Sequence, residues 1–224
     1  EFAGVVAHEF GHFTQSVGMR LSYIIRSINV WFMRVVYERD AWDEALEDWV
    51  NEIEDGWVTA IVMIAQFGVW FARFILRILM YIGWLIGGFM LRQMEYDADR
   101  AEVAIAGVKA YVSTAQALPA LAAADSAARH RVIENLAHQQ LPDDLSALAA
   151  EERQRFDPAT VERIRSAAHS EKTGLFDSHP CQSERIAAAR KVGGEGIIAL
   201  DAPGTALFRR FETLAKVATV AEYR

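Results

Sequence analysis

The sequence is poor in cysteine and in positive charge. Its 224 residues contain a single cysteine, Cys181, which excludes an internal disulfide framework. Lysine and arginine number 23 against 30 aspartates and glutamates, and this deficit argues against a dedicated nucleic-acid-binding protein, which would show a basic face. The low hydrophobicity typical of a disordered chain is also missing, since 52% of the residues are hydrophobic. The composition therefore predicts a folded domain of ordinary size.

Charge is distributed very unevenly along the chain. Residues 57–91 hold two ionisable charges, Arg73 and Arg77, whereas segment 38–55 carries nine acidic residues and one basic residue. The chain begins at Glu1 rather than at methionine and shows no signal peptide, so we expect it to be an internal fragment of a longer protein.

The pattern of apolar residues predicts a mainly α fold. We expect one long helix over 2–37, an amphipathic helix over 40–55 and a third helix over 57–108. From residue 110 the chain is alanine-rich, with helix signals that end at four prolines and a short strand at 197–200; the prolines are Pro119, Pro142, Pro158 and Pro180. We divide the chain into 1–108 and an alanine-rich helical region, 109–224.

Residues 8–12 form an HExxH motif, His8-Glu9-Phe10-Gly11-His12. On a helix, the two histidines lie one turn apart on one face and can share one Zn²⁺, while Glu9 sits beside them as a general base. The apolar flanks, Phe10 and Phe13 included, predict that this helix is buried. Catalytic zinc needs a third protein ligand and an open position for water.

Glu95 is the best candidate for that third ligand. Glu95 and Asp99 are four residues apart on one helical face, so Asp99 could orient a histidine from behind. If 12–53 and 54–95 form two antiparallel helical arms, their equal lengths return Glu95 to the level of His8 and His12. Three other histidines lie in alanine-rich or charged, surface-like helices and are weaker candidates: His130, His138 and His169.

The order of these motifs resembles the HtpX-like and CAAX-prenyl-protease-like zinc metallopeptidases, gluzincins of metallopeptidase family forty-eight. HEFGH is followed by a hydrophobic hairpin, then by EYDADRAE at 95–102 and DSHPCQSERIAA at 177–188. The resemblance implies a zincin-type metallopeptidase core within 1–108 and one Zn²⁺ per chain. It further implies that His8, His12 and Glu95 are ligands, Glu9 the general base, Asp99 a supporting residue behind the ligands and His179 a neighbour of the reacting carbonyl. Cys181 stands where related sequences often have a second proline, and we expect no function for it.

The hydrophobic hairpin predicts a membrane location. His12 and Glu95 must lie on the same side of the membrane to bind one metal ion. The chain between them would therefore cross the bilayer an even number of times, with spans at 17–37 and within 57–91. Arg20 and Arg92 flank these spans on the zinc side, which would then be cytoplasmic, in a bacterial inner membrane. The alternatives are a soluble hairpin covered by other parts of the protein and an oligomer interface, because several arginines would lie in or near the apolar layer.

The leading interpretation is a membrane-associated zinc endopeptidase that acts on protein or peptide substrates in quality control or processing, with membrane lipid as a further partner. A catalytically silent membrane chaperone or scaffold of the same fold is the alternative. A structural zinc site would normally use four protein ligands and favour cysteine, of which the chain has one.

Overall fold

The structure, a computed structural model, describes residues 1–38, 56–136 and 140–223. Within these ranges the regular elements are all helical, which confirms the mainly α fold. They are α1 (Phe2–Phe13), α2 (Ser16–Tyr37), α4 (Gly56–Ala106), α5 (Val108–Leu136), α6 (Leu145–Arg155), α7 (Pro158–Ser170), α8 (Gln182–Val192), the 3₁₀ turn η1 (Gly204–Leu207) and α9 (Phe211–Glu222). The helix expected over 40–55 lies outside the described residues.

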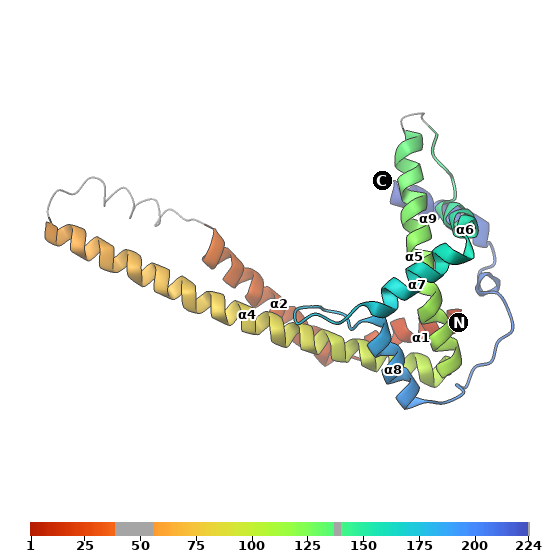
Figure 1. Cartoon of the computed structure of the whole chain (residues 1–224), viewed down its shortest axis with the longest axis horizontal. Helices are drawn as coiled ribbons and strands as arrows, with labels where there is room; N and C mark the ends of the chain where they lie inside the picture. The colour runs from red at the N-terminus through yellow and green to blue at the C-terminus, as the bar shows by residue number, and fades with distance from the viewer. Residues whose placement is uncertain (39–55, 137–139, 224) are drawn as a thin grey trace. The chain divides into compact units, whose positions relative to one another are not determined.

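The chain forms two compact units. One, here called the core unit, comprises 1–14, 95–173 and 180–224; the other, the hairpin unit, comprises 15–94 and 174–179. Helix α4 is continuous and contributes to both, as its unbroken ribbon in Figure 1 shows. The division at residue 108 that the sequence suggested stays a prediction.

In the hairpin unit, α2 runs antiparallel to the first part of α4. Near one end the Arg73 Nε donates to the Val35 carbonyl at 3.2 Å, and near the other the Gln15 side chain donates to the Met94 carbonyl at 2.8 Å. Between them the Asn29 amide lies directly against Gly83, which has no side chain to displace it.

The single helix expected over 2–37 is instead two helices, α1 and α2. The chain turns at Thr14, whose N–H and hydroxyl both bond to the Gly11 carbonyl, at 3.2 and 2.8 Å. This local bonding takes the place of the next helical turn, and α2 begins only at Ser16. Apolar periodicity continues across the break, which explains why the pattern alone predicted one element.

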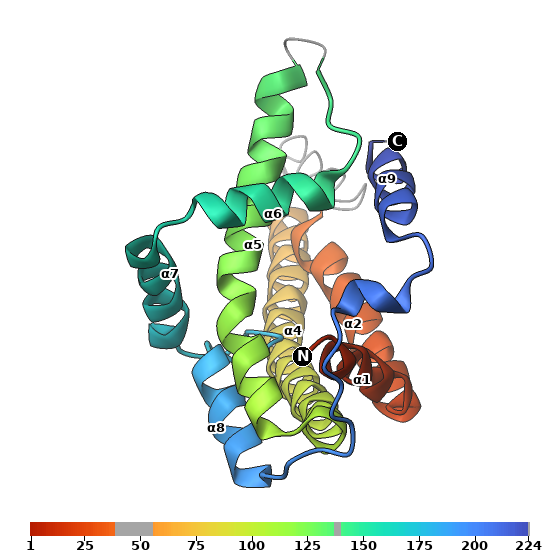
Figure 2. The same cartoon turned by 90° about the vertical axis from the view of Figure 1, so that its right-hand side faces the viewer.

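In the core unit, α5 is the central helix, and α6, α7 and α8 pack against it. Figure 2 shows α6 crossing α5 and α8 lying along its first part. The buried cluster unites the end of α4 with α5 and α8 and consists of Val103, Tyr111, Ile186 and Ala189.

Pro119 lies inside α5 rather than at a helix end, so that expectation was wrong. A proline in a helix has no N–H for the carbonyl four residues earlier, which is here the Ala115 carbonyl. The Gln182 side-chain amide at the start of α8 donates to that same carbonyl. The cost of an unpaired carbonyl is thus removed by a neighbouring helix, and α5 continues to Leu136.

The strand expected at 197–200 is also absent from the described chain. The N–H groups of Ile197 and Ile198 both donate to the Ile105 carbonyl in the last turn of α4, at 3.0 and 2.9 Å. These two N–H groups therefore hydrogen-bond a carbonyl at the C-terminal end of α4 and do not pair with another strand.

Helix α1 packs very closely on the second part of α4 through two glycines. A Cβ on Gly11 would lie 3.0 Å from the Ala98 Cα, and one on Gly4 would lie 3.0 Å from the Ala106 Cβ. The opposite face of α1 is open, with Phe10 and Phe13 exposed by 64% and 72%. The expectation that Phe10 and Phe13 set this helix in a buried position was therefore wrong.

We predict that Gly11→Leu destabilises the protein by about 1–3 kcal/mol, because overpacking of a tight contact costs roughly that much. The thermal unfolding midpoint of the purified protein measures the effect. Gly68→Leu is the control, since a side chain at Gly68 meets nothing within 4 Å. Equal midpoints for the two variants would contradict the close packing of α1 on α4.

Candidate metal centre

Three predicted site residues come together where α1 meets α4. His8 and His12 project from α1 toward Glu95 on α4, and the candidate ligand atoms lie within 4.8 Å of one another. The His8 Nε2 is 3.7 Å from the Glu95 Oε2, and the His12 Nε2 is 3.9 Å from the Glu95 Oε1. Glu95 is 8% exposed, so the group sits at the base of a partly open site.

This donor set fits a divalent metal ion. Tetrahedral ligands about 2.0–2.1 Å from a zinc ion lie roughly 3.3 Å apart, close to the spacings found here. Two imidazoles and one carboxylate are also a ligand combination known for catalytic zinc. Three converging ligands leave a fourth position for water or substrate.

Asp99 stands behind His8, as expected from its position one turn after Glu95. Its Oδ1 is 3.2 Å from the His8 Nδ1, and Asp99 is 2% exposed. The contact is close but not aligned as a hydrogen bond, since the buried Nδ1 has no partner with good geometry. The Asp99 carboxylate nevertheless raises the pKa of His8.

Arg185 on α8 completes this arrangement, and the sequence analysis gave it no role. Its Nε and Nη2 donate to the two Asp99 oxygens at 2.9 and 2.5 Å, and its Nη2 also lies 3.5 Å from the Glu95 Oε2. Burial alone would raise the pKa of Asp99, but contacts with His8, Arg185 and the Tyr111 hydroxyl lower it below its usual value. Asp99 is therefore held ionised, facing His8. The Ser-Glu-Arg run after the SHP motif was the only sequence signal for this arginine.

A second acidic residue, Glu102, lies near the same histidine. Its Oε2 is 3.8 Å from the His8 Nδ1, and His8, Asp99 and Glu102 form another possible ligand set. Both Asp99 oxygens are already bonded to Arg185, and burial raises the pKa of Glu102, which favours its neutral form. The set with His12 and Glu95 is therefore the better metal site.

Two further predicted residues lie outside this cluster. Glu9 is exposed on α1, next to His8 in the chain. His179 is exposed in the loop 174–179, which belongs to the hairpin unit. His130 and His169 are exposed, as expected, and His138 is outside the described residues.

The loop that carries His179 is held against α4 within the hairpin unit. The Arg92 guanidinium donates to the Asp177 carbonyl at 2.6 Å, and the Asp177 side chain accepts from the Gly174 N–H at 2.6 Å. The Phe176 ring lies 6.2 Å from that of Tyr81 and 6.4 Å from that of Trp84. Side chains of α4 thus determine the position of this loop.

Comparison with known proteins identifies the family of the chain. The model of peptidase family M48 matches residues 1–192. The chain therefore belongs to peptidase family M48, a family of metallopeptidases that hydrolyse peptide bonds. Searches of the curated proteins and of the solved structures gave no match.

We predict that Arg185→Ala weakens zinc binding by about 10–100-fold, the usual effect of removing a residue that supports a metal ligand. Without Arg185, the buried Asp99 carboxylate loses the cation that keeps it charged behind His8. Competition with a chelator measures the affinity, and Glu95→Ala, which removes a candidate ligand, should abolish binding. Arg190→Ala, an exposed arginine on α8, is the matched control. If Arg185→Ala bound zinc as tightly as the wild-type protein, Asp99 would orient His8 without help from Arg185.

Proposed function

We propose that this chain is a zinc-dependent endopeptidase that cleaves protein substrates at a membrane. The convergence of His8, His12 and Glu95, with Asp99 behind His8, is the observation that carries the proposal. Membership of peptidase family M48 supports peptide-bond hydrolysis as the reaction. His8, His12 and Glu95 would hold one zinc ion.

Bound zinc would polarise the substrate carbonyl and make the attacking water more acidic. Glu9 follows His8 on α1 and is exposed, so its carboxylate is free to take the proton from that water and pass it to the leaving amine. Asp99 and Arg185 keep His8 oriented and add no chemistry of their own. The roles fall to separate residues, so they can be tested separately.

The hairpin unit supports a membrane location. Helix α4 is the one helix in the described ranges that is long and apolar enough to cross a bilayer, and its most apolar 18-residue stretch, of mean hydropathy 1.9, is only 11% buried. Large apolar side chains along it are open to the surroundings, among them Trp57, Ile64, Phe67, Trp70 and Phe89. Exposed apolar surface of this extent is typical of a face that meets lipid or another protein.

Two of the arginines that made this location costly, Arg73 and Arg77, have partners inside the hairpin unit. Arg73 donates to the Val35 carbonyl, and the Arg77 guanidinium lies 5.5 Å from the centre of the Tyr37 ring. Such contacts reduce the cost of a cation in an apolar layer. Helix α2 does not meet the same criterion of length and apolar composition by itself. We propose that it crosses the bilayer paired with α4, with the zinc site on the cytoplasmic side of a bacterial inner membrane.

We predict that Glu9→Gln abolishes peptide hydrolysis while zinc stays bound, because Glu9 moves protons but is not a ligand. Metal content and casein cleavage are measured on one sample of the full-length protein, with and without chelator. Retained activity in the variant would contradict the mechanism. A wild-type protein that binds zinc but cleaves no substrate would instead favour the scaffold function.

We also predict that His179→Ala lowers kcat by about 10²–10³, the typical cost of losing one donor to the oxyanion that develops at the carbonyl. Zinc content and KM should change little, because such a contact strengthens only in the transition state. His169→Ala, another exposed histidine, is the control. Loss of zinc from His179→Ala would make this residue a ligand, and normal kcat would leave it a structural role.

A further inference from the structure

Arg20 and Arg26 of the hairpin unit have no hydrogen bond or ion pair within the described residues, and of these two only Arg26 lines a cavity. Arg34 pairs with Glu38 at 3.7 Å, and Arg73 and Arg77 have the partners described above. Across residues 1–38, 56–136 and 140–223, no hydrogen bond or ion pair is found for the Arg26 guanidinium. A cation on an apolar helix is costly unless it meets an anion, so Arg26 points to an anionic partner from outside the chain.

Arg26 extends into a cavity of about 640 Å³ between α2 and α4. On α4 its wall includes three glycines, Gly83, Gly87 and Gly88, which contribute no side chains. The loop 174–179 closes one side with Phe176 and Ser178. This volume lies within the range of sites that bind small molecules.

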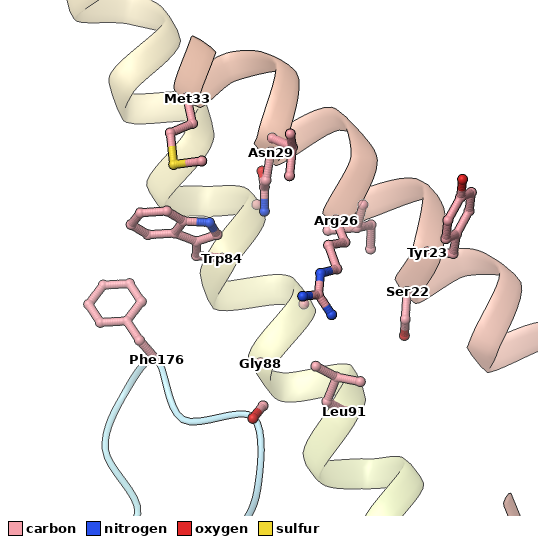
Figure 3. A pocket seen from close by; sticks show the side chains of 14 residues that line it. Ser22, Tyr23, Arg26, Asn29, Met33, Trp84, Gly88, Leu91 and Phe176 are labelled. Carbon is pink, nitrogen blue, oxygen red and sulfur yellow. The ribbon is translucent and has the colours of Figure 1, made fainter. Parts of the chain in front are cut away.

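The lining is polar toward one end and apolar toward the other. Figure 3 shows the Arg26 side chain reaching from α2 toward Gly88, with Ser22 and Tyr23 on one side of it. On its other side Met33, Trp84 and Phe176 gather around the far part of the cavity. The matching ligand carries an anion next to an apolar chain.

We propose that this cavity binds an anionic phospholipid, with the headgroup phosphate on Arg26 and an acyl chain against Trp84 and Phe176. The inference rests on the membrane location proposed above. It favours lipid over a peptide because α4 exposes apolar side chains beside the cavity, such as Ile86 and Phe89, so the surrounding medium would itself supply the ligand. Arginine suits this role because its planar guanidinium donates two parallel hydrogen bonds to a phosphate.

Bound lipid would also act on the loop that carries His179. Phe176 lines the cavity and lies against Tyr81 and Trp84, so an acyl chain there adds contacts that hold the loop in place. We therefore expect anionic lipid to raise peptidase activity through the order of this loop.

The test uses full-length protein purified from membranes and reconstituted in vesicles of phosphatidylcholine, with or without phosphatidylglycerol. Native mass spectrometry counts the phosphatidylglycerol that stays bound. Arg26→Ala should lower this retention by about tenfold, the factor expected for the loss of one charge-assisted hydrogen bond. Arg26→Lys should retain part of it. Arg20→Ala is the matched control, since Arg20 is an exposed arginine of α2 that does not line the cavity.

Four results would overturn the proposal. The first two are equal lipid retention in Arg26→Ala and Arg20→Ala, and equal retention of phosphatidylcholine and phosphatidylglycerol by the wild-type protein. The third is peptidase activity that does not depend on phosphatidylglycerol. The fourth is unchanged lipid retention with impaired cleavage in Arg26→Ala, which would indicate that the cavity binds a peptide. Alkaline carbonate extraction of membranes shows whether a negative result contradicts the lipid site or the membrane location on which it rests. Protein released by carbonate contradicts the membrane location itself, whereas embedded protein with unchanged lipid contradicts only the lipid site.

Discussion

The close contact between α1 and α4 is the constraint on which the metal site depends. Two imidazoles on one helix can share an ion with a carboxylate on another only if the two helices nearly touch. Gly4 and Gly11 permit this, because a Cβ at either position would lie 3.0 Å from an atom of α4, closer than ordinary van der Waals contact. Ala98 and Ala106 are the matching small residues on α4, so the site needs small residues as much as it needs its ligands.

The second requirement is a stable negative charge behind His8. Asp99 is almost completely buried, and burial favours the neutral form of a carboxyl group. Arg185 reverses this with two hydrogen bonds, and burial does not neutralise the arginine because the same carboxylate raises its pKa. The pair is costly to separate, since either partner alone would be a buried, uncompensated charge. The buried apolar cluster around Tyr111 and Ile186 packs α8 against α4 and α5, and so keeps the two partners of this pair together.

Sequence patterns predicted the features that depend on local spacing. The HExxH motif and the Glu95–Asp99 pair follow from helical periodicity, and the structure brings those residues together. Patterns did not predict features that depend on contacts distant in sequence. Arg185 lies 86 residues after Asp99, and nothing near it indicates a buried partner. The helix break at Thr14 and the continuation of α5 through Pro119 were missed because hydrogen bonds that periodicity does not record decide both.

Pro119 weakens the hydrogen bonding of α5 but provides a contact for the neighbouring helix α8. The carbonyl that this proline leaves unpaired in α5 is the acceptor that fixes Gln182, the first residue of α8, and Arg185 follows one turn later on that helix. A residue with an N–H at position 119 would add a second donor to the Ala115 carbonyl, which the Gln182 amide now has to itself. An apparent defect in one helix thus provides a contact that holds the start of another, the helix that carries Arg185.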